Sequence, residues 1–169
     1  MRVLETERLE LHELELGDAG FVLELLNDPT WLASLPDRGV RTLDDARGYL
    51  EREPLAMYAA HGMGLWRVDS KDTGEALGIC GLLRREFLDD VDLGFALLER
   101  HQGRGYALEA ARGCLEEARR RGLARVVAIT TDDNAASRGL LERLGFALDG
   151  EVRAAPDAEP LLLYAVGLT

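Results

Sequence analysis

The sequence is poor in the residues that mark several classes of protein. Two cysteines, Cys80 and Cys114, and three histidines occur among 169 residues, and none of them has the spacing of metal ligands. We therefore predict no metal site. Both cysteines lie in apolar patterns, so we expect reduced, buried thiols, with a disulfide or a nucleophilic thiol as the alternative.

Long apolar segments are also missing. No apolar run is long enough to span a bilayer, and the first residues lack the apolar core of a signal peptide. We therefore expect a cytoplasmic protein that does not associate with a membrane. The length of 169 residues suits one domain, residues 1–169, with a core large enough to fold without disulfides.

Positive charge is scarce as well. The chain has 20 basic and 31 acidic residues, a formal net charge of −11, and Lys71 is its one lysine. Such a balance argues against nucleic acid as a partner. It would steer a cationic partner, such as an amine, toward the protein, although acidity also serves solubility.

Hydrophobic periodicity predicts strands alternating with helices. We expect strands at 9–15, 63–68, 77–83, 91–98, 125–131, 146–152 and 161–166. We expect helices at 18–27, from Thr42 or Asp44 to Arg52, at 105–121 and from Asn134 to Gly145, with one helical turn near Trp31. This alternation predicts an α/β sheet that is parallel at least around residues 91–131.

One stretch combines several signals of anion binding. It consists of Gln102, Gly103, Arg104, Gly105, Tyr106 and Ala107, between a predicted strand and a predicted helix. Glycines let backbone N–H groups approach an anion, and a helix N-terminus adds free N–H groups and the positive end of its dipole. Such a corner binds phosphate, although Gly-x-Gly also occurs in plain turns. A dinucleotide fingerprint is excluded because Leu108 stands where its third glycine is required.

Three motifs resemble those of the GNAT acetyltransferases. Gln102-x-x-Gly105-x-Ala107 is similar to the family's pyrophosphate-binding signature. Asn134-x-x-Ser137, followed by Leu144-Gly145-Phe146, is similar to its second cofactor motif. Thr6-Glu7-Arg8-Leu9 resembles the opening of the RimJ/RimL branch. The motifs come in the expected order and span nearly the whole chain.

The resemblance implies an α+β fold. Its central sheet would be mixed and largely antiparallel, with about six to seven strands, helices on both faces and a splayed parallel pair around the cofactor. Acetyl-CoA would be the co-substrate, with its pyrophosphate on residues 102–107. Its pantetheine arm would run along Ala96, Leu97 and Leu98, near Asn134, which can also be a plain N-cap.

The resemblance further implies an N-acetyltransferase in which a primary amine attacks the thioester directly. The acceptor would be a protein N-terminal α-amine, of the ribosomal-protein type, or a small-molecule amine. The alternative is a non-catalytic acyl-CoA-binding or partner-binding module of the same fold. Either protein would be a monomer or a homodimer.

Two residues are candidates for catalysis. Asp92 is a candidate general base that shares a strand face with Gly94 and Ala96, and its alternative is a solvated turn charge beside Asp89 and Asp90. Ser137 is a candidate proton donor to the leaving thiolate, because it occupies the family position often given that role. Its alternative is a surface serine. An oxyanion donor is expected among the strand N–H groups near residues 95–97.

The acceptor site is less well defined by the sequence. Trp31 and Tyr58 are candidate walls of an acceptor cleft, whereas Trp66 is expected in the core. His101 is expected to be an exposed loop histidine. Relatives usually have a longer segment between the last two strands than the Pro/Ala-rich residues 153–160.

Overall fold

The computed structural model describes residues 1–168. Its strands are β1 (Arg2–Glu5), β2 (Leu9–Glu13), β3 (Leu65–Ser70), β4 (Ala76–Leu83), β5 (Asp92–Leu97), β6 (Arg125–Thr130), β7 (Ala147–Val152) and β8 (Leu161–Gly167). Within these residues they form one eight-stranded sheet in the order β1-β2-β3-β4-β5-β6-β8-β7. The pair β5–β6 is parallel and the other pairs are antiparallel. The predicted mixed, largely antiparallel sheet is confirmed, and the strand beyond the predicted number is β1.

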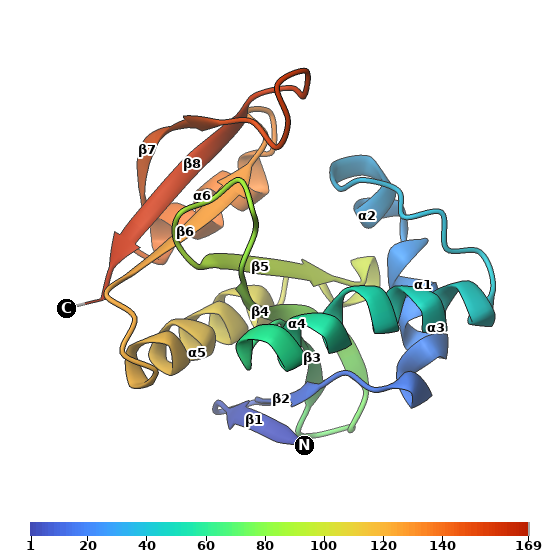
Figure 1. The fold of residues 1–169 in the computed structure, drawn as a ribbon. Coiled ribbons are helices and arrows are strands. Elements are labelled where there is room, and N and C mark those ends of the chain that lie inside the picture. Colours follow the sequence, from blue (N-terminus) through green and yellow to red (C-terminus); the bar gives the residue numbers. More distant parts are fainter. Residues whose placement is uncertain (169) are drawn as a thin grey trace.

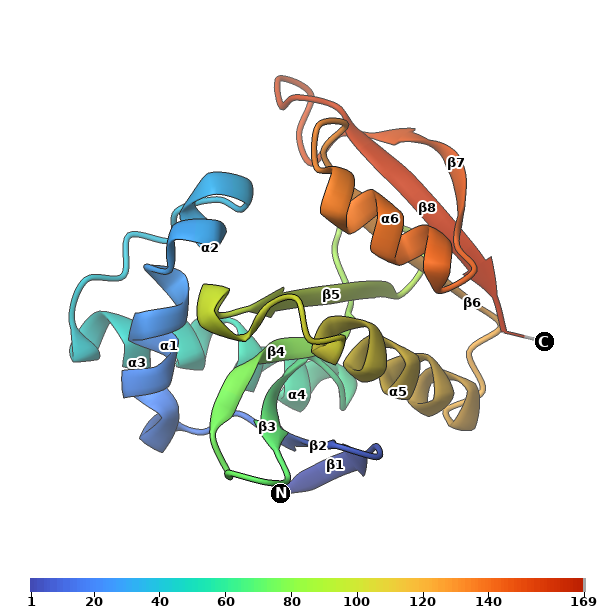
Figure 2. The ribbon, with the colours of Figure 1, turned by 180° about the vertical axis from the view of Figure 1, so that it is seen from behind.

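Helices cover both faces of the sheet, as predicted. They are α1 (Ala19–Leu26), α2 (Pro29–Ser34), α3 (Leu43–Arg52), α4 (Pro54–His61), α5 (Tyr106–Arg120) and α6 (Ala135–Arg143), with short 3-10 turns at Leu16–Asp18 and Glu99–His101. Helices α3 and α4 lie in front of the sheet in Figure 1, with α1 behind α3 at the right-hand side, whereas α5 and α6 lie in front in the reverse view of Figure 2. Among residues 1–168, no helix is long and apolar enough to cross a membrane.

The two faces have separate apolar cores. The inward face of α5, which includes Ala111, Leu115 and Ala118, packs against the sheet together with Trp66. On the other face, α1 and α3 pack around Ile79 and Leu98. The apolar stripe predicted for α5 is therefore buried, which removes its surface from water and anchors the helix on β4 and β5. Cys80 and Cys114 are buried and free, as expected.

The sheet opens between β5 and β6. Strand β5 pairs with β4 along its whole length, from Asp92↔Leu83 to Leu97↔Gly78. It meets β6 at a single register position, Asp92↔Val127, where Val127 N donates to Val91 O at 2.9 Å. Beyond this point the two strands diverge (Figure 1), and β6 continues beside β8. The edge of β5 that faces β6 consequently has no ladder of hydrogen bonds after its first residue.

Candidate active site

The phosphate-binding stretch lies at the end of β5, where the chain turns into α5. Gly103 and Gly105 have φ values of 79° and 80°, a left-handed conformation that residues with a Cβ adopt at a cost. Gly105 is the N-cap of α5 and has no side chain that could accept a hydrogen bond from the first N–H groups of the helix. The first N–H groups of α5 are therefore not capped by a side chain of that residue, which is the arrangement that binds an anion.

A hydrogen-bond network ties this loop to the start of α2. Gln102 Nε2 donates to Leu97 O and to Thr30 Oγ1, each at 3.1 Å. The Thr30 hydroxyl donates in turn to Asp28 Oδ1 at 2.6 Å, and Glu99 N donates to Asp28 Oδ2 at 3.1 Å. The side chain of Gln102 thus holds the loop in place, and Asp28 and Thr30 are supporting residues that the sequence did not reveal.

The carboxylate of Asp28 is the anchor of that network. Burial alone would raise the pKa of Asp28, but the hydrogen bonds from Thr30 and from the N–H of Glu99 outweigh burial and lower the pKa below its ordinary value. Asp28 therefore stays ionised at neutral pH, and its two oxygens connect α2 to the loop that follows β5.

The open edge of β5 presents particular backbone groups to the gap. Leu98 N donates to Leu77 O at 3.0 Å, so the residues of β5 in phase with Leu98, including Ala96, direct their backbone toward β4. In a strand this direction alternates, and the N–H groups of Phe95 and Leu97 therefore face β6. Of the three residues predicted to line the pantetheine arm, Leu97 is the one whose N–H faces the gap.

The opposite wall of the gap begins with α6. Asn134 Oδ1 accepts a hydrogen bond from Ser137 N at 3.1 Å, so the predicted N-cap is confirmed. Asn134 also lines a cavity of about 300 Å³ between α2 and the turn from β6 to α6, together with Ala33, Ser34, Thr131, Asp133 and Ala135. Ser137 is half-buried in the first turn of α6. The cavity brings α2, which carries no predicted cofactor residue, next to the second cofactor motif.

Asp92 is the most unusual ionisable group of the site. Its side chain is 1 % exposed, so the expectation of a solvated turn charge is wrong. The physical reason is that Asp92 lies within β5, paired with Leu83 of β4 on one side and with Val127 of β6 on the other. The turn at residues 89–90 ends before it.

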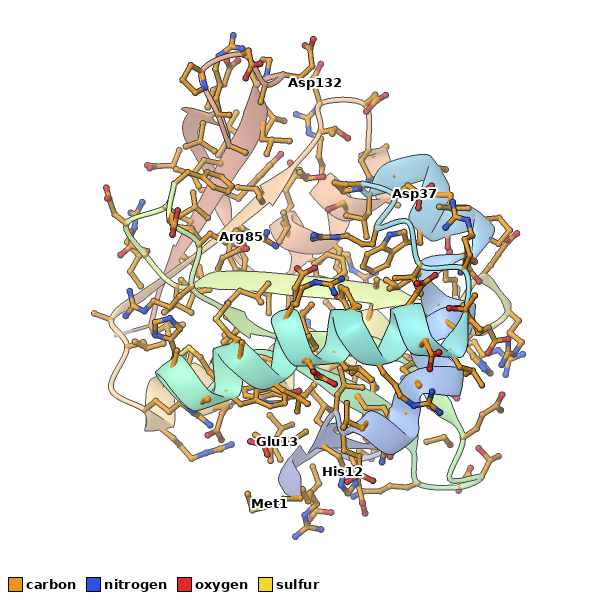
Figure 3. All side chains as sticks on the ribbon, turned by 45° about the vertical axis from the view of Figure 1, so that its right-hand side comes forward. Met1, His12, Glu13, Asp37, Arg85 and Asp132 are labelled. Carbon is orange, nitrogen blue, oxygen red and sulfur yellow. The ribbon has the colours of Figure 1, made fainter. Side chains whose placement is uncertain are left out.

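The carboxylate of Asp92 has one partner. Arg85 Nε donates to Asp92 Oδ2 at 2.6 Å, whereas Asp92 Oδ1 is buried without a hydrogen-bond partner. Figure 3 shows Arg85 near the beginning of β5. Burial raises the pKa of Asp92 to about 6, against the opposing charge and hydrogen bond of Arg85. An unoccupied carboxylate oxygen with such a pKa can accept a proton near neutral pH.

Other candidate residues have structural roles. His101 is 8 % exposed and its Nε2 lies 3.1 Å from Glu75 Oε1, so the expectation of an exposed histidine is wrong; the 3-10 turn folds its ring inward. Trp66 is in the core, as expected. Trp31 is buried and donates to Pro36 O at 3.1 Å. The Tyr58 hydroxyl donates to Leu65 O and accepts from Leu14 N.

Comparisons with known proteins agree with this geometry. Residues 8–147 match the family described as the acetyltransferase (GNAT) domain. The uncharacterized protein YkkB of Bacillus subtilis (strain 168) is 31 % identical over 157 residues, which cover 89 % of this chain and 88 % of YkkB. An acetyltransferase structure from Agrobacterium tumefaciens str. C58 is 28 % identical, with a TM-score of 0.78, and the match covers 98 % of this chain and 94 % of that one.

A RimL ribosomal-protein α-N-acetyltransferase, solved in complex with coenzyme A, has the same fold. It is 20 % identical, with a TM-score of 0.83, and the match covers 99 % of this chain and 98 % of RimL. Because the family model matches residues 8–147, which are most of the chain, the protein belongs to the GNAT acetyltransferase family and is a GNAT N-acetyltransferase. This confirms the N-acetyltransferase predicted from the three motifs.

Proposed function

We propose that this enzyme transfers the acetyl group of acetyl-CoA to a primary amine by direct attack on the thioester. The observation that carries the proposal is the open edge of β5, which leads directly into the glycine-rich corner at residues 102–107. An extended pantetheine arm can pair with this edge as an added strand would, while the diphosphate accepts hydrogen bonds from the N–H groups of the corner.

The two walls of the gap have different roles in this proposal. The N–H groups of Phe95 and Leu97 bind the arm and stabilise the oxyanion that forms when the thioester carbonyl is attacked. Asn134 contacts the arm from α6, beside the cavity that α2 closes. The whole chain, residues 1–169, acts as one domain in this proposal. The reason is that β5, which forms one wall of the gap, and β6, which leads into α6 on the other wall, belong to the same sheet.

Proton transfer is assigned to two side chains. An amine is mostly protonated at neutral pH, so it must lose a proton before it can attack. Asp92, with its pKa of about 6 and its unpartnered but buried oxygen, accepts that proton through a chain of water molecules. The amine nitrogen then bonds to the acetyl carbon and the C–S bond breaks. The proton that this nitrogen loses as it becomes an amide passes to the departing thiolate, to which the Ser137 hydroxyl donates a hydrogen bond.

The acceptor that we propose is a protein N-terminal α-amine, of the ribosomal-protein type, or a small-molecule amine in the cytoplasm. The net charge of −11 favours the approach of a cationic amine. Incubation with acetyl-CoA and a panel of peptides and amines, followed by thiol release and mass spectrometry, tests this. We expect acetylated product. No transfer to any acceptor, together with no CoA binding in calorimetry, would contradict the proposal.

The role of Ser137 is tested by Ser137→Ala. We expect kcat to fall about tenfold, because the thiolate loses one hydrogen-bond donor in the transition state. The KM for acetyl-CoA should not change. A matched control is Ser70→Ala, which removes a hydroxyl from the last residue of β3, where it accepts from Thr73 N. A rate equal to that of the wild type would remove Ser137 from the mechanism.

A further inference from the structure

The turn between β1 and β2 lies against the glycine-rich corner at residues 102–107, although β1 and β2 are at one edge of the sheet, beyond β3 and β4. Arg8 N donates to Glu109 Oε2 at 2.8 Å, although the two residues are 101 positions apart. Arg8 Nε donates to Glu109 Oε1 at 2.6 Å, and the Thr6 hydroxyl donates to Glu109 Oε2 at 2.5 Å. Figure 2 shows this turn beside α5. The first turn of α5 is therefore fastened to the N-terminal hairpin.

The guanidinium of Arg8 also contacts both neighbours of Gly105. Its Nη1 donates to Arg104 O at 3.0 Å, and its central carbon lies 4.6 Å from the centroid of the Tyr106 ring. A Cβ placed on Gly105 would lie 3.3 Å from Arg8 Nη2, so the guanidinium packs directly over this glycine. One side chain thus touches three consecutive residues of the corner.

These contacts matter because a loop with two glycines does not fix its own conformation. Glycine samples positive and negative φ with similar ease, so Gly103 and Gly105 lose much freedom when their N–H groups converge on an anion. A bond to the carbonyl between them, at Arg104, restrains both before a ligand arrives. Restraining a binding loop in its bound form improves affinity by removing that cost from the binding step.

Electrostatics give Arg8 a second effect. Glu109 is the acidic residue in the first turn of α5. Its negative charge there interacts favourably with the positive end of the helix dipole. The same charge would repel a diphosphate at that N-terminus. The ion pair with Arg8, at 2.6 Å, offsets this charge, and the carboxylate side chain is only 19 % exposed. The pair therefore keeps the stabilising carboxylate without leaving a free negative charge at the anion site.

We propose that Arg8, held by Glu109, is a positioning residue for the diphosphate of acetyl-CoA. It acts through the carbonyl of Arg104 and the ring of Tyr106, which orient the backbone N–H groups of the corner. This inference rests on the proposed function. It gives the Thr6-Glu7-Arg8 motif a part in donor binding, although the motif lies in the first hairpin of the chain.

The test compares donors with and without a diphosphate. For Arg8→Ala we expect the Kd for CoA, measured by calorimetry, and the KM for acetyl-CoA each to rise about tenfold, with kcat unchanged. The kcat/KM for S-acetylpantetheine, which lacks the diphosphate, should remain that of the wild type. Arg8→Lys keeps the charge but not the planar fork, so its Kd for CoA should lie between those of the wild type and Arg8→Ala.

Arg2→Ala is the matched control. Arg2 lies on the same hairpin and makes an exposed ion pair with Glu5, at 3.6 Å, so its loss changes the net charge equally and should leave the Kd for CoA unchanged. A Kd for Arg8→Ala within about twofold of the wild type would overturn the inference. An equal loss of kcat/KM with both donors would also overturn it, because that result indicates a general structural defect. Failure of the wild type to bind CoA would instead reject the proposed function.

Discussion

Gly105→Ala is expected to weaken CoA binding by about a hundredfold in calorimetry, the equivalent of one or two charge-assisted hydrogen bonds. Gly105 has φ 80°, a conformation that costs a residue with a Cβ about 1–2 kcal/mol. An alanine there would relax toward negative φ and turn the first N–H groups of α5 away from the diphosphate. Its Cβ would also lie 3.3 Å from Arg8 Nη2 and displace the guanidinium.

The chain contains a matched control for this change at the other end of α5. Gly122 has φ 83°, and a Cβ on it would meet no heavy atom within 4 Å. Gly122→Ala therefore introduces similar backbone strain, and we expect a similar fall in Tm, but the affinity for CoA should be unchanged. Equal CoA affinity in the Gly105→Ala variant and the wild type would contradict the placement of the diphosphate. An equal loss in both variants would show that strain alone weakens binding.

The fold was predictable where signals were local. Helix α5 has a long apolar stripe, and the β3–β4 hairpin has two β-branched and aliphatic runs around a polar loop, so both were found within two residues of their ends. The sequence does not predict strand β1, because the strand has only four residues, of which Leu4 alone is buried, and they show no clear alternation. Helix α4 was missed because Pro54 alone of its eight residues is buried, which leaves its periodicity weak.

The candidate site was only partly predictable for a similar reason. Gly103 and Gly105 mark their corner by composition, and Asn134 marks a helix start. Asp28 and Arg8 act on the same corner from 71 and 96 positions away, through Glu99 N and Arg104 O. Nothing in their local sequence sets those contacts, because they follow from which strands become neighbours in the sheet.

The state of Asp92 shows the same limit most clearly. A run of three aspartates in four residues, 89–92, is typical of a solvated turn. Local sequence cannot show that the third of them enters β5 between two other strands, and it is this position that buries the carboxylate. Its changed pKa is therefore a consequence of sheet order, not of the neighbouring charges in the sequence.

Asp92→Asn is expected to lower kcat about a hundredfold at pH 8, a typical effect for the loss of a general base. The carboxylate must be unprotonated to accept a proton, and burial raises the pKa of Asp92 to about 6. The activity of the wild type should therefore rise with pH through about pH 6, and the variant should lack this step. Steady-state rates with a fixed amine across pH 5–9 measure both. Asp89→Asn, an exposed carboxylate in the preceding turn, is the control and should behave as the wild type.

Arg85→Met identifies the titrating group independently. The charge of Arg85 and its hydrogen bond to Asp92 Oδ2 lower the pKa of Asp92, whereas burial raises it. Removing the guanidinium leaves burial unopposed, so the rise of the steady-state rate with pH should move to higher pH. The maximal rate above that rise should change less than in Asp92→Asn. If the rise in activity near pH 6 remains in both Arg85→Met and Asp92→Asn, the titrating group is not Asp92. The direction of the shift is therefore decisive, because replacing Arg85 can raise the pKa of a buried carboxylate but cannot lower it.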